Sequence, residues 1–212
     1  VRVSPADAEG NHSLGPNYDM VLDAIKSNPK VIVIAEINEN IPVTTVKNKI
    51  SSKKITASFK SSSKLAGPPI VPVTEVEANI GKNLGQLVGN GSTLQIGIGN
   101  IFGGLPNGLS ENNVKDIKIF TEMFGDPLKT IMERGIATKA TTGFAYGSES
   151  LYKWLDKNQD VKFESTTNVN RPSTVSSTKN FVAINTALQI NLRGDVNATT
   201  GQDGVRISSP GG

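Results

Sequence analysis

The sequence has no cysteine and a single histidine, His12, among 212 residues. Without cysteine the chain forms no disulfide and offers no thiolate to a metal ion or a substrate. One histidine excludes a cluster of histidine ligands and argues against a Ser-His-Asp triad. His12 lies in a polar loop, where we expect a surface side chain. Acid–base or covalent chemistry therefore falls to carboxylates, lysines, tyrosines or hydroxyls, and we expect no metal site.

Two further features are missing. No apolar stretch reaches the roughly 18 residues that a membrane helix needs, so we expect no membrane partner. The 22 basic and 19 acidic residues are interspersed and give a net charge of only +3. Such a surface lacks the basic patch that binds a phosphate backbone, so we expect no nucleic acid. The lack of cysteine favours a reducing compartment and a cytoplasmic location, although a chain that starts at Val1 leaves an organellar signal untested.

The composition is that of a globular, loop-rich protein, with 36% hydrophobic residues, 21 glycines and 11 prolines. Apolar residues at helical spacing over 18–28 precede a β-branched run over 31–37. That run predicts a strand buried on both faces, as in a parallel sheet. A helix followed by a buried strand is typical of an α/β fold.

Residues 42–72 are rich in lysine, serine and proline, which predicts a connecting segment. Helices are expected over 74–88, 126–135 and 149–158, and strands over 93–98, 114–120 and 180–192. Thr74 and Glu77 form a capping-box pattern at the start of the first of these helices. We therefore expect residues 1–50 to belong to a first α/β domain, 51–72 to be a linker, and 73–212 to form a second domain.

A glycine-rich stretch follows the strand expected at 93–98. Gly97, Gly99, Gly103 and Gly104 let backbone N–H groups approach an anion or a carbonyl oxygen. The spacing is similar to that of a dinucleotide-binding loop, but Pro106 and Gly108 are expected to break the helix that such a loop requires. An anion site, a nucleotide site and an unliganded turn all stay open from the residues alone.

Glu122 stands where the apolar run of residues 117–120 stops, just before an Asp-Pro turn. A side chain at the carboxyl end of a strand in an α/β sheet faces the crevice where ligands bind. Its carboxylate is therefore a ligand hook, a reacting group or the first solvated acid of a loop. The local sequence does not choose among these three.

Seven blocks, in order, resemble the acetyl-CoA hydrolase/transferase family, which includes 4-hydroxybutyrate, butyrate and acetate CoA-transferases. They read "VSPADAEGNHSLG", "IAEINENIP", "GSTLQIGIGN", "FTEMFGD", "LYKWLDKN", "NVNRP" and "FVAINTALQINLRGDVNATTG". The resemblance implies two similar open α/β domains with the active site between them. It also implies that Glu122 is the nucleophile, through a glutamyl-CoA thioester.

The resemblance implies roles for other residues as well. Asn170 and the closing Gly211 and Gly212 are similar to parts of the oxyanion and thioester environment. Gly97, Ile98, Gly99 and Asn100 resemble part of the CoA and acyl site. Coenzyme A is then a substrate rather than a tightly bound cofactor, a short-chain carboxylic acid is the second substrate, and a homo-oligomer is expected. We further expect the backbone of 97–100 and Glu122 to line one pocket.

The sequence departs from the family at two places. Phe120 stands where the family often has histidine, and the glycine loop continues as Ile101-Phe102-Gly103-Gly104. Both departures leave the acyl group open. Family members extend past both ends of this chain, so we expect the second domain to be incomplete. An acyl-CoA hydrolase and a non-catalytic CoA- or dinucleotide-binding module are the alternatives.

Overall fold

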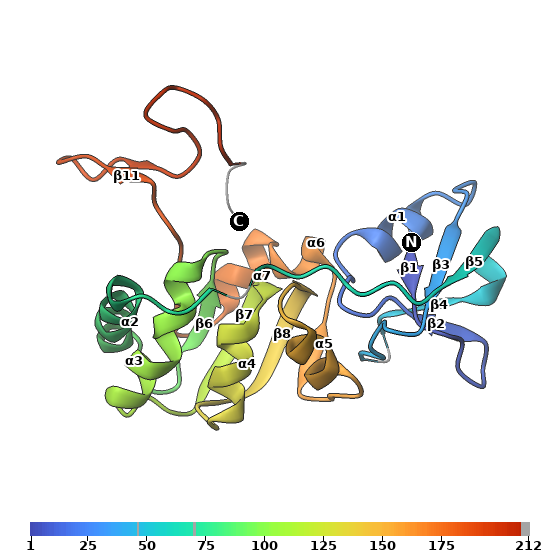
Figure 1. Ribbon diagram of the computed structural model, residues 1–212, viewed down its shortest axis with the longest axis horizontal. Helices are drawn as coiled ribbons and strands as arrows, with labels where there is room; N and C mark the ends of the chain where they lie inside the picture. The colour runs from blue at the N-terminus through green and yellow to red at the C-terminus, as the bar shows by residue number, and fades with distance from the viewer. Residues whose placement is uncertain (46, 70, 209–212) are drawn as a thin grey trace.

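Two separate parallel sheets organise the chain (Figure 1). The computed structural model describes residues 1–45, 47–69 and 71–208. The first sheet has the order β1-β3-β5, from β1 (Arg2–Val3), β3 (Ile34–Asn38) and β5 (Ala57–Ser61). Beside it lie α1 (Val21–Ser27), the antiparallel pair β2 (Asn11–Ser13) and β4 (Lys49–Ser51), and a 3-10 turn, η1 (Ser52–Lys54). We refer to residues 1–61 as the N-terminal unit.

The second sheet has five parallel strands in the order β10-β6-β7-β8-β9. They are β6 (Thr93–Ile96), β7 (Ile117–Phe124), β8 (Ala137–Ala145), β9 (Val161–Phe163) and β10 (Phe181–Ile184). Helices α3 (Leu105–Glu111), α4 (Asp126–Glu133) and α5 (Glu149–Leu155) lie over one face, and α2 (Glu75–Leu87) packs on α3 (Figure 1). A mixed α/β fold with a parallel sheet is thus confirmed.

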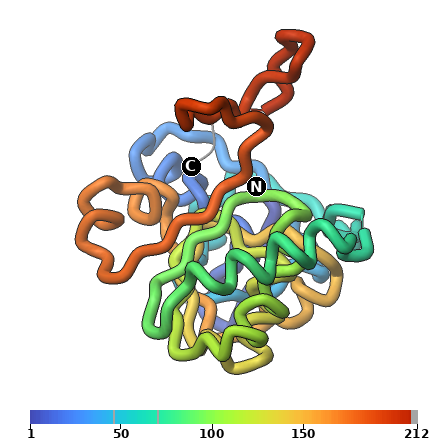
Figure 2. The backbone as a smooth tube through the Cα atoms, turned by 90° about the vertical axis from the view of Figure 1, so that its left-hand side faces the viewer, coloured from blue at the N-terminus to red at the C-terminus, as the bar shows by residue number. Residues whose placement is uncertain are grey.

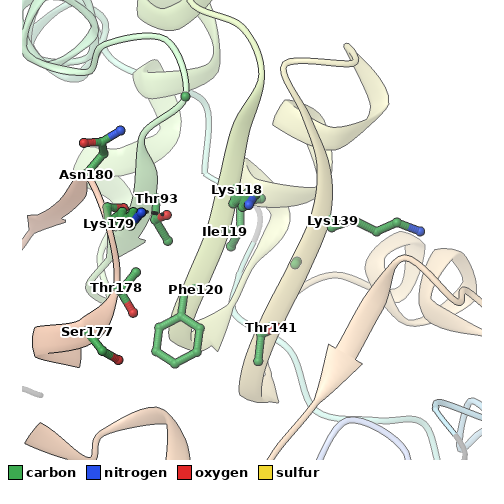
Figure 3. Close-up of a pocket in the computed structure, with 12 residues that line it drawn as sticks. Thr93, Lys118, Ile119, Phe120, Lys139, Thr141, Ser177, Thr178, Lys179 and Asn180 are labelled. Carbon is green, nitrogen blue, oxygen red and sulfur yellow. Dashed lines mark hydrogen bonds between the residues drawn. The ribbon is translucent and has the colours of Figure 1, made fainter. Parts of the chain in front are cut away.

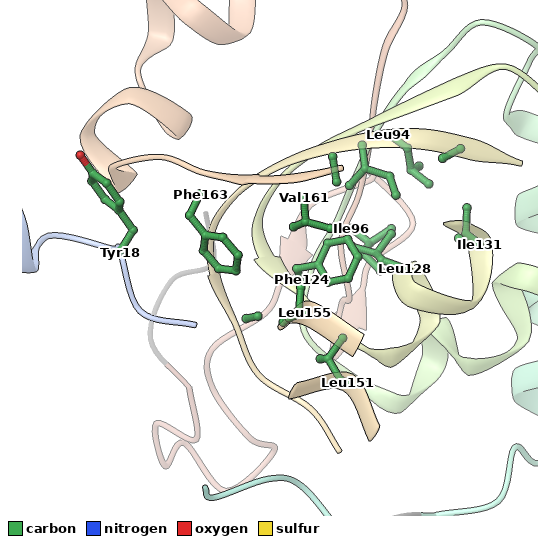
Figure 4. Close-up of a cluster of buried hydrophobic side chains, with 14 of the residues drawn as sticks. Tyr18, Leu94, Ile96, Phe124, Leu128, Ile131, Leu151, Leu155, Val161 and Phe163 are labelled. Carbon is green, nitrogen blue, oxygen red and sulfur yellow. The ribbon is translucent and has the colours of Figure 1, made fainter. Parts of the chain in front are cut away.

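The core lies between this sheet and its helices (Figure 4). Strand pairing aligns Leu94, Ile119, Ala140 and Val161 in one row across four strands, and all four side chains are buried. They meet apolar side chains of the helices, among them Leu128, Ile131, Leu151 and Leu155. The next residues along three of the strands, Phe120, Thr141 and Lys162, point to the opposite face and are half-buried or exposed. The sheet therefore has one face covered by helices, whereas on the other face, the open face, the short helix α6 (Thr166–Val169) contacts β7 and β8.

The start of α2 follows the sequence prediction. The Thr74 hydroxyl accepts from the Glu77 N–H, and the Glu77 carboxylate accepts from the Thr74 N–H, which completes a capping box. These two bonds satisfy N–H groups that a helix start leaves without partners. The local pattern alone was sufficient here.

Helices α2 and α3 cross through glycines on both sides. A Cβ added at Gly108 would lie 1.9 Å from the Gly81 carbonyl oxygen, and one at Gly81 would lie 2.1 Å from the Gly104 carbonyl carbon. The expectation that Pro106 and Gly108 would break a helix here is wrong. Pro106 occupies the first turn of α3, where its missing N–H costs nothing, and Gly108 is needed for the close crossing.

The segment predicted as a linker contains ordered structure. Strand β5 lies within 51–72 and pairs with β3, so the N-terminal sheet includes the first part of this segment. The described residues between 62 and 74 have no helix or strand. They are held to the second sheet's helices where the Tyr152 hydroxyl donates to Ala66 O at 2.7 Å. The domain boundaries themselves stay a prediction.

Two expectations about the N-terminal unit are wrong. Strand β3 is not buried on both faces, because Ile34 is 57% exposed whereas Ala35 is fully buried. His12 is not a surface residue, since it is 4% exposed. Its ring nitrogens lie 2.8 Å from Ser4 O and 3.0 Å from Ser52 Oγ, which satisfies both. The polar loop around His12 folds back on itself, which no local pattern indicates.

The apolar run at 180–192 is divided. Its first part is β10, and its end forms a hairpin of β11 (Gln189–Ile190) and β12 (Val196–Asn197). The hairpin stands away from the body of the molecule (Figure 2). In the described residues, no helix is long and apolar enough to cross a membrane.

Candidate active site

Glu122 lies on β7, with Met123 and Phe124 continuing the strand beyond it. The strand predicted over 114–120 therefore begins three residues later and ends four residues later than expected. Ile119 and Thr121 point into the core, so Glu122, on the alternate face, points toward the open side of the sheet and is half-buried. Its backbone is held by the pairing of β7 with β8, while its carboxylate stays accessible.

A glycine lies beside Glu122 on the neighbouring strand β8. Thr121 pairs with Thr142 and Met123 with Phe144, which places Gly143 opposite Glu122 on β8. On the other side, β6 pairs with β7 at Thr93–Lys118 and Leu94–Ile119, and the Thr121 hydroxyl donates to Ile96 O at 3.0 Å. Because Gly143 has no side chain, the Thr166 hydroxyl comes close to this part of β8: a Cβ at Gly143 would lie 3.1 Å from Thr166 Oγ1.

Asn170 meets Glu122 from a distant part of the chain. It follows the short helix α6 (Thr166–Val169), just before α7 (Pro172–Ser177). Its side-chain Nδ2 donates to Glu122 Oε2 at 2.9 Å. Asn170 is exposed and Glu122 half-buried, so this amide and carboxylate share a solvent-accessible position. The two residues that the resemblance assigned to catalysis are thus in direct contact, while their chemical roles stay a prediction.

Three residues around Glu122 were missed by the sequence prediction: Asp19, Gly143 and Thr166. Thr166 Oγ1 donates to Asp19 Oδ1 at 2.5 Å, and the Asp19 N–H donates to Gly143 O at 3.0 Å. Gly143 lies on β8, a strand that the apolar-run criterion overlooked because its sequence is rich in alanine and threonine. The β-branched threonines of "ATKATTGFA" are the signal that predicts it.

The loop 97–100 lies where the strand order of the sheet reverses. The chain runs from β6 through β9 in one direction and then returns to place β10 on the other side of β6. Ligands in open α/β sheets bind beside such switch points. The Gly97 N–H donates to Ile184 O at 2.8 Å and is already used. Within the described chain, the N–H groups of Ile98 and Gly99 have no acceptor.

Ile98, Gly99 and Asn100 line a hollow of about 520 Å³ on the helix-covered side of the sheet edge. Met123 also lines it, but Glu122, on the other face of the same strand, does not. The expectation that the 97–100 backbone and Glu122 line one pocket does not hold for this hollow, because adjacent residues of a strand point to opposite faces. A ligand that touches both regions has to cross the edge of the sheet.

A second hollow of about 610 Å³ lies on the open face (Figure 3). Phe120 and Thr141 point into this region from β7 and β8, and Lys118 and Lys179 line it. Lys139 also belongs to its lining, but its side chain extends away from the other labelled residues and pairs with Asp160 (Figure 3). Phe120 lies one step down the same face from Glu122.

Two hydroxyl groups at the start of α6 lower the pKa of Asp23, an acid of the N-terminal unit. The Ser165 hydroxyl donates to Asp23 and lowers the pKa of that carboxyl group, and Thr167 Oγ1 adds a bond of 2.8 Å. Burial raises the pKa of the nearby Tyr18 hydroxyl, and the charge of Asp23 adds to that rise. Helix α1 and the start of α6 are therefore fastened by an ionised acid.

Two sequence-based expectations remain, for the C-terminal glycines and for metal binding. Gly211 and Gly212 lie outside the described residues. Over the residues that are described, no group of three His, Asp or Glu side chains is arranged to hold a metal ion.

Known proteins that are similar in sequence to this chain include CoA-transferases. Residues 147–212 match the family "Acetyl-CoA hydrolase/transferase C-terminal domain". This range includes Asn170 but not Glu122. The chain is 30% identical to a succinyl-CoA:cyclohexane-1-carboxylate CoA transferase of Geobacter metallireducens, over 91% of this chain and 45% of that protein. It is also 30% identical to the 4-hydroxybutyrate coenzyme A transferase of Clostridium kluyveri, over 92% of this chain and 47% of that protein.

Solved structures share the fold. A 4-hydroxybutyrate CoA-transferase of Porphyromonas gingivalis superimposes with a TM-score of 0.84 at 26% identity, over 97% of this chain and 59% of that one. The fold is thus the one seen in CoA-transferases. The resemblance to the acetyl-CoA hydrolase/transferase family is confirmed. The chain spans about half the length of the curated relatives it matches.

Proposed function

We propose that the protein transfers coenzyme A between an acyl-CoA and a short-chain carboxylic acid, with Glu122 as the nucleophile. The observation that carries this proposal is the contact of the Asn170 amide with the Glu122 carboxylate, beside Gly143 of β8. A half-buried carboxylate that is oriented by a neutral amide donor suits attack on the carbonyl carbon of a thioester. The CoA-transferases among the relatives support the same class of reaction.

The first half of the reaction loads coenzyme A onto the protein. A Glu122 oxygen attacks the thioester carbonyl carbon, the C–S bond breaks, and a mixed anhydride and CoA thiolate result. The thiolate then attacks the glutamyl carbonyl carbon of the anhydride. The bond between the glutamyl carbonyl carbon and the bridging oxygen breaks, the first carboxylic acid leaves as its anion with that oxygen, and Glu122 is now a CoA thioester.

The second half reverses these steps with another acid. The incoming carboxylate attacks the glutamyl thioester, which expels CoA thiolate and forms a new anhydride. The thiolate attacks the acyl carbonyl carbon, which yields the new acyl-CoA and restores the Glu122 carboxylate. Charge and atoms balance without an external proton donor or oxidant, which agrees with a chain that has no cysteine and one histidine.

Asn170 has a role that changes during these steps. In the resting protein its amide donates to Glu122 and holds the carboxylate in one orientation. When Glu122 becomes acylated it loses its negative charge, and the same N–H is better used by the oxyanion of a tetrahedral intermediate. The unused N–H groups of Ile98 and Gly99 are further candidate donors. One such donor contributes on the order of 10²–10³ in rate.

Partial burial of Glu122 also matters. A carboxylate that is half-removed from water is a stronger nucleophile, and its anhydride is less exposed to hydrolysis. Met123 and Phe124 continue the strand beyond it and shield its backbone. The placement of the site between two similar α/β domains, as the family resemblance implies, belongs to this proposal too.

The test is performed on the full-length protein with butyryl-CoA and isotopically labelled acetate. We expect labelled acetyl-CoA to form, and Glu122→Gln to abolish its formation without unfolding the protein. Trapping with borohydride or hydroxylamine in the presence of acyl-CoA should modify Glu122. Glu149→Gln is the control, because Glu149 is an exposed acid on α5 paired with Lys153. Normal transfer by Glu122→Gln, or a label on another acid, would refute the assignment.

An acyl-CoA hydrolase is the second candidate. Two relatives are named acetyl-CoA hydrolase, from Candida albicans at 25% identity and Neurospora crassa at 22% identity. Water then takes the place of the acceptor acid at the glutamyl thioester. Release of free coenzyme A at the same rate with and without acetate would favour hydrolysis, whereas a rate that depends on acetate favours transfer.

A further inference from the structure

A continuous hydrogen-bonded path joins Asp19 of the N-terminal unit to Glu122. Thr166 Oγ1 donates to Asp19 Oδ1 at 2.5 Å, and the Thr166 N–H donates to Asp19 O at 3.2 Å. The Asn170 N–H then donates to Thr166 O at 2.8 Å, and the Asn170 side chain donates to Glu122 Oε2 at 2.9 Å. A single residue, Thr166, thus separates Asp19 from the amide that orients the carboxylate.

Asp19 also holds the strand that pairs with β7 at Glu122. Its N–H donates to Gly143 O at 3.0 Å, and Gly143 lies opposite Glu122 on β8. The adjacent Thr142 hydroxyl donates to Glu122 O at 3.0 Å. A Cβ at Gly143 would lie 3.1 Å from both Glu122 O and Thr166 Oγ1, so these groups are tightly gathered. Asp19 therefore fixes one residue on each side of the carboxylate, Gly143 on the strand and Thr166 before Asn170.

The backbone of Asp19 is in a conformation that few side chains adopt. Its φ is +37°, in the left-handed region where aspartate and asparagine are tolerated better than most residues. Such a conformation persists only where surrounding contacts compensate for it. Three hydrogen bonds to Gly143 and Thr166 do so here. This strained residue lies where the N-terminal unit contacts β8 and α6 of the second sheet.

We propose that Asp19 is a positioning residue for Glu122, through Thr166 and Asn170 on one side and Gly143 on the other. The proposal rests on the function proposed above for Glu122. It makes the activity of a residue on the second sheet depend on the docking of the N-terminal unit. Asp19 touches no reacting atom and acts only through the orientation of its neighbours.

The neighbouring Asp23 provides the comparison. It is likewise an acid of the N-terminal unit bonded to the start of α6, through Ser165 and Thr167. Neither of these residues bonds to Asn170, however, according to the described contacts. If Asp19 merely fastened the two parts together, loss of either acid would change stability and leave the chemical step alone.

The experiment compares variants that separate the side chain from the strained backbone. Asp19→Gly relieves the positive φ and keeps both backbone bonds but removes the carboxylate. Asp19→Asn keeps an acceptor oxygen and tolerates the same φ. Thr166→Val and Thr166→Ser remove and retain the hydroxyl partner. Asp23→Ala is the control for docking, because Asp23 joins the same two parts through Ser165 and Thr167. Asp7→Ala is the control for loss of an acid within the N-terminal unit, where Asp7 is bonded to Lys49 and the Asn11 N–H.

For the full-length protein we expect Asp19→Gly and Thr166→Val to lower kcat for CoA transfer about tenfold or more, with KM within about twofold, because misplacement of about 1 Å costs up to about 100-fold. Asp19→Asn and Thr166→Ser should restore most of kcat, and neither Asp23→Ala nor Asp7→Ala should reduce it; a loss in Asp23→Ala equal to that in Asp19→Gly would assign the effect to docking and overturn the proposal. An unchanged kcat in Asp19→Gly would overturn the proposal while leaving the function of Glu122 intact.

A second readout does not depend on activity. In isotope-labelled protein, NMR resonances of the Asn170 side-chain amide and the Glu122 carboxyl carbon should both shift in Asp19→Gly and stay in place in Asp7→Ala. Unchanged resonances would overturn the proposal even if kcat fell. If the wild-type protein neither transfers nor hydrolyses acyl-CoA, the proposed function fails, and these resonances alone decide whether Asp19 positions Glu122.

Discussion

Replacement of Gly108 by alanine should destabilise the protein, although alanine favours helices more than glycine does. Gly108 lies in α3, where its backbone passes directly over α2. The added Cβ would lie 1.9 Å from Gly81 O and 2.4 Å from Gly81 C, whereas real contacts of this kind stay beyond 3.0 Å. The obstacle is backbone and not the end of a flexible side chain. The helices must therefore separate by about 1 Å.

Two opposing effects set the magnitude. Alanine in a helix interior is favoured over glycine by about 1 kcal/mol. Overpacking that shifts backbone costs about 1–3 kcal/mol and sometimes more. Because the clash is with carbonyl atoms of Gly81, the cost should fall at the upper end. We expect a net loss of about 1–2 kcal/mol in the free energy of unfolding.

Urea unfolding followed by circular dichroism and by the fluorescence of Trp154, the one tryptophan in the sequence, measures this loss. With a slope of about 2 kcal/mol/M, the midpoint should fall by about 0.5–1 M. Gly89→Ala is the matched control, since a Cβ there meets only Ser92 Oγ at 3.9 Å. It should be neutral or slightly stabilising. A Gly108→Ala protein as stable as the wild type would refute the argument from helix crossing.

Three further predictions follow from single contacts. Asn170→Ala should lower kcat for CoA transfer by about 10²-fold or more, and Asn170→Asp should lower it further because it places a second negative charge beside the Glu122 carboxylate. If both variants had the kcat of the wild type, the donor role of Asn170 would be contradicted. Glu36 is bonded first of all to Arg2, which lowers its pKa to about 2, so this contact stabilises the fold above the ordinary glutamate pKa near 4.5 and is lost as pH falls through about 2. A carbon NMR titration should give a midpoint near 2 that rises in Arg2→Met, and a midpoint near 4.5 in the wild type would disprove it. Tyr152→Phe should cost about 1 kcal/mol, because it removes the bond to Ala66 O, and limited proteolysis between residues 62 and 69 should accelerate; unchanged cleavage would show that this bond does not hold the segment.

Much of the architecture could be predicted from the sequence because its signals are local. The capping residues Thr74 and Glu77 lie three positions apart, and each needs only the other and its own backbone. The apolar run before Glu122 identifies a strand of a parallel sheet because burial on the covered face needs apolar side chains. The family blocks pointed to Glu122 and Asn170 without any knowledge of their distance.

The failures have a common physical cause. Gly108 is unfavourable for a helix considered alone, and only the approach of α2 makes it necessary. Strand β8 carries small and polar residues because a Cβ at Gly143 would crowd Thr166 Oγ1 at 3.1 Å, and because the Thr142 hydroxyl donates to the backbone of Glu122. Ile34 belongs to an apolar run, yet it is exposed because the first sheet is covered on one face only in the described chain.

The site itself is a product of tertiary structure. Glu122 and Asn170 are 48 residues apart in sequence, and Asp19 and Thr166 are 147 apart. Their contacts depend on the order of the parallel strands and on the docking of the N-terminal unit, which no window of sequence encodes. The sequence by itself therefore determined which residue types carry the chemistry, and the packing of the two units decided which of them meet.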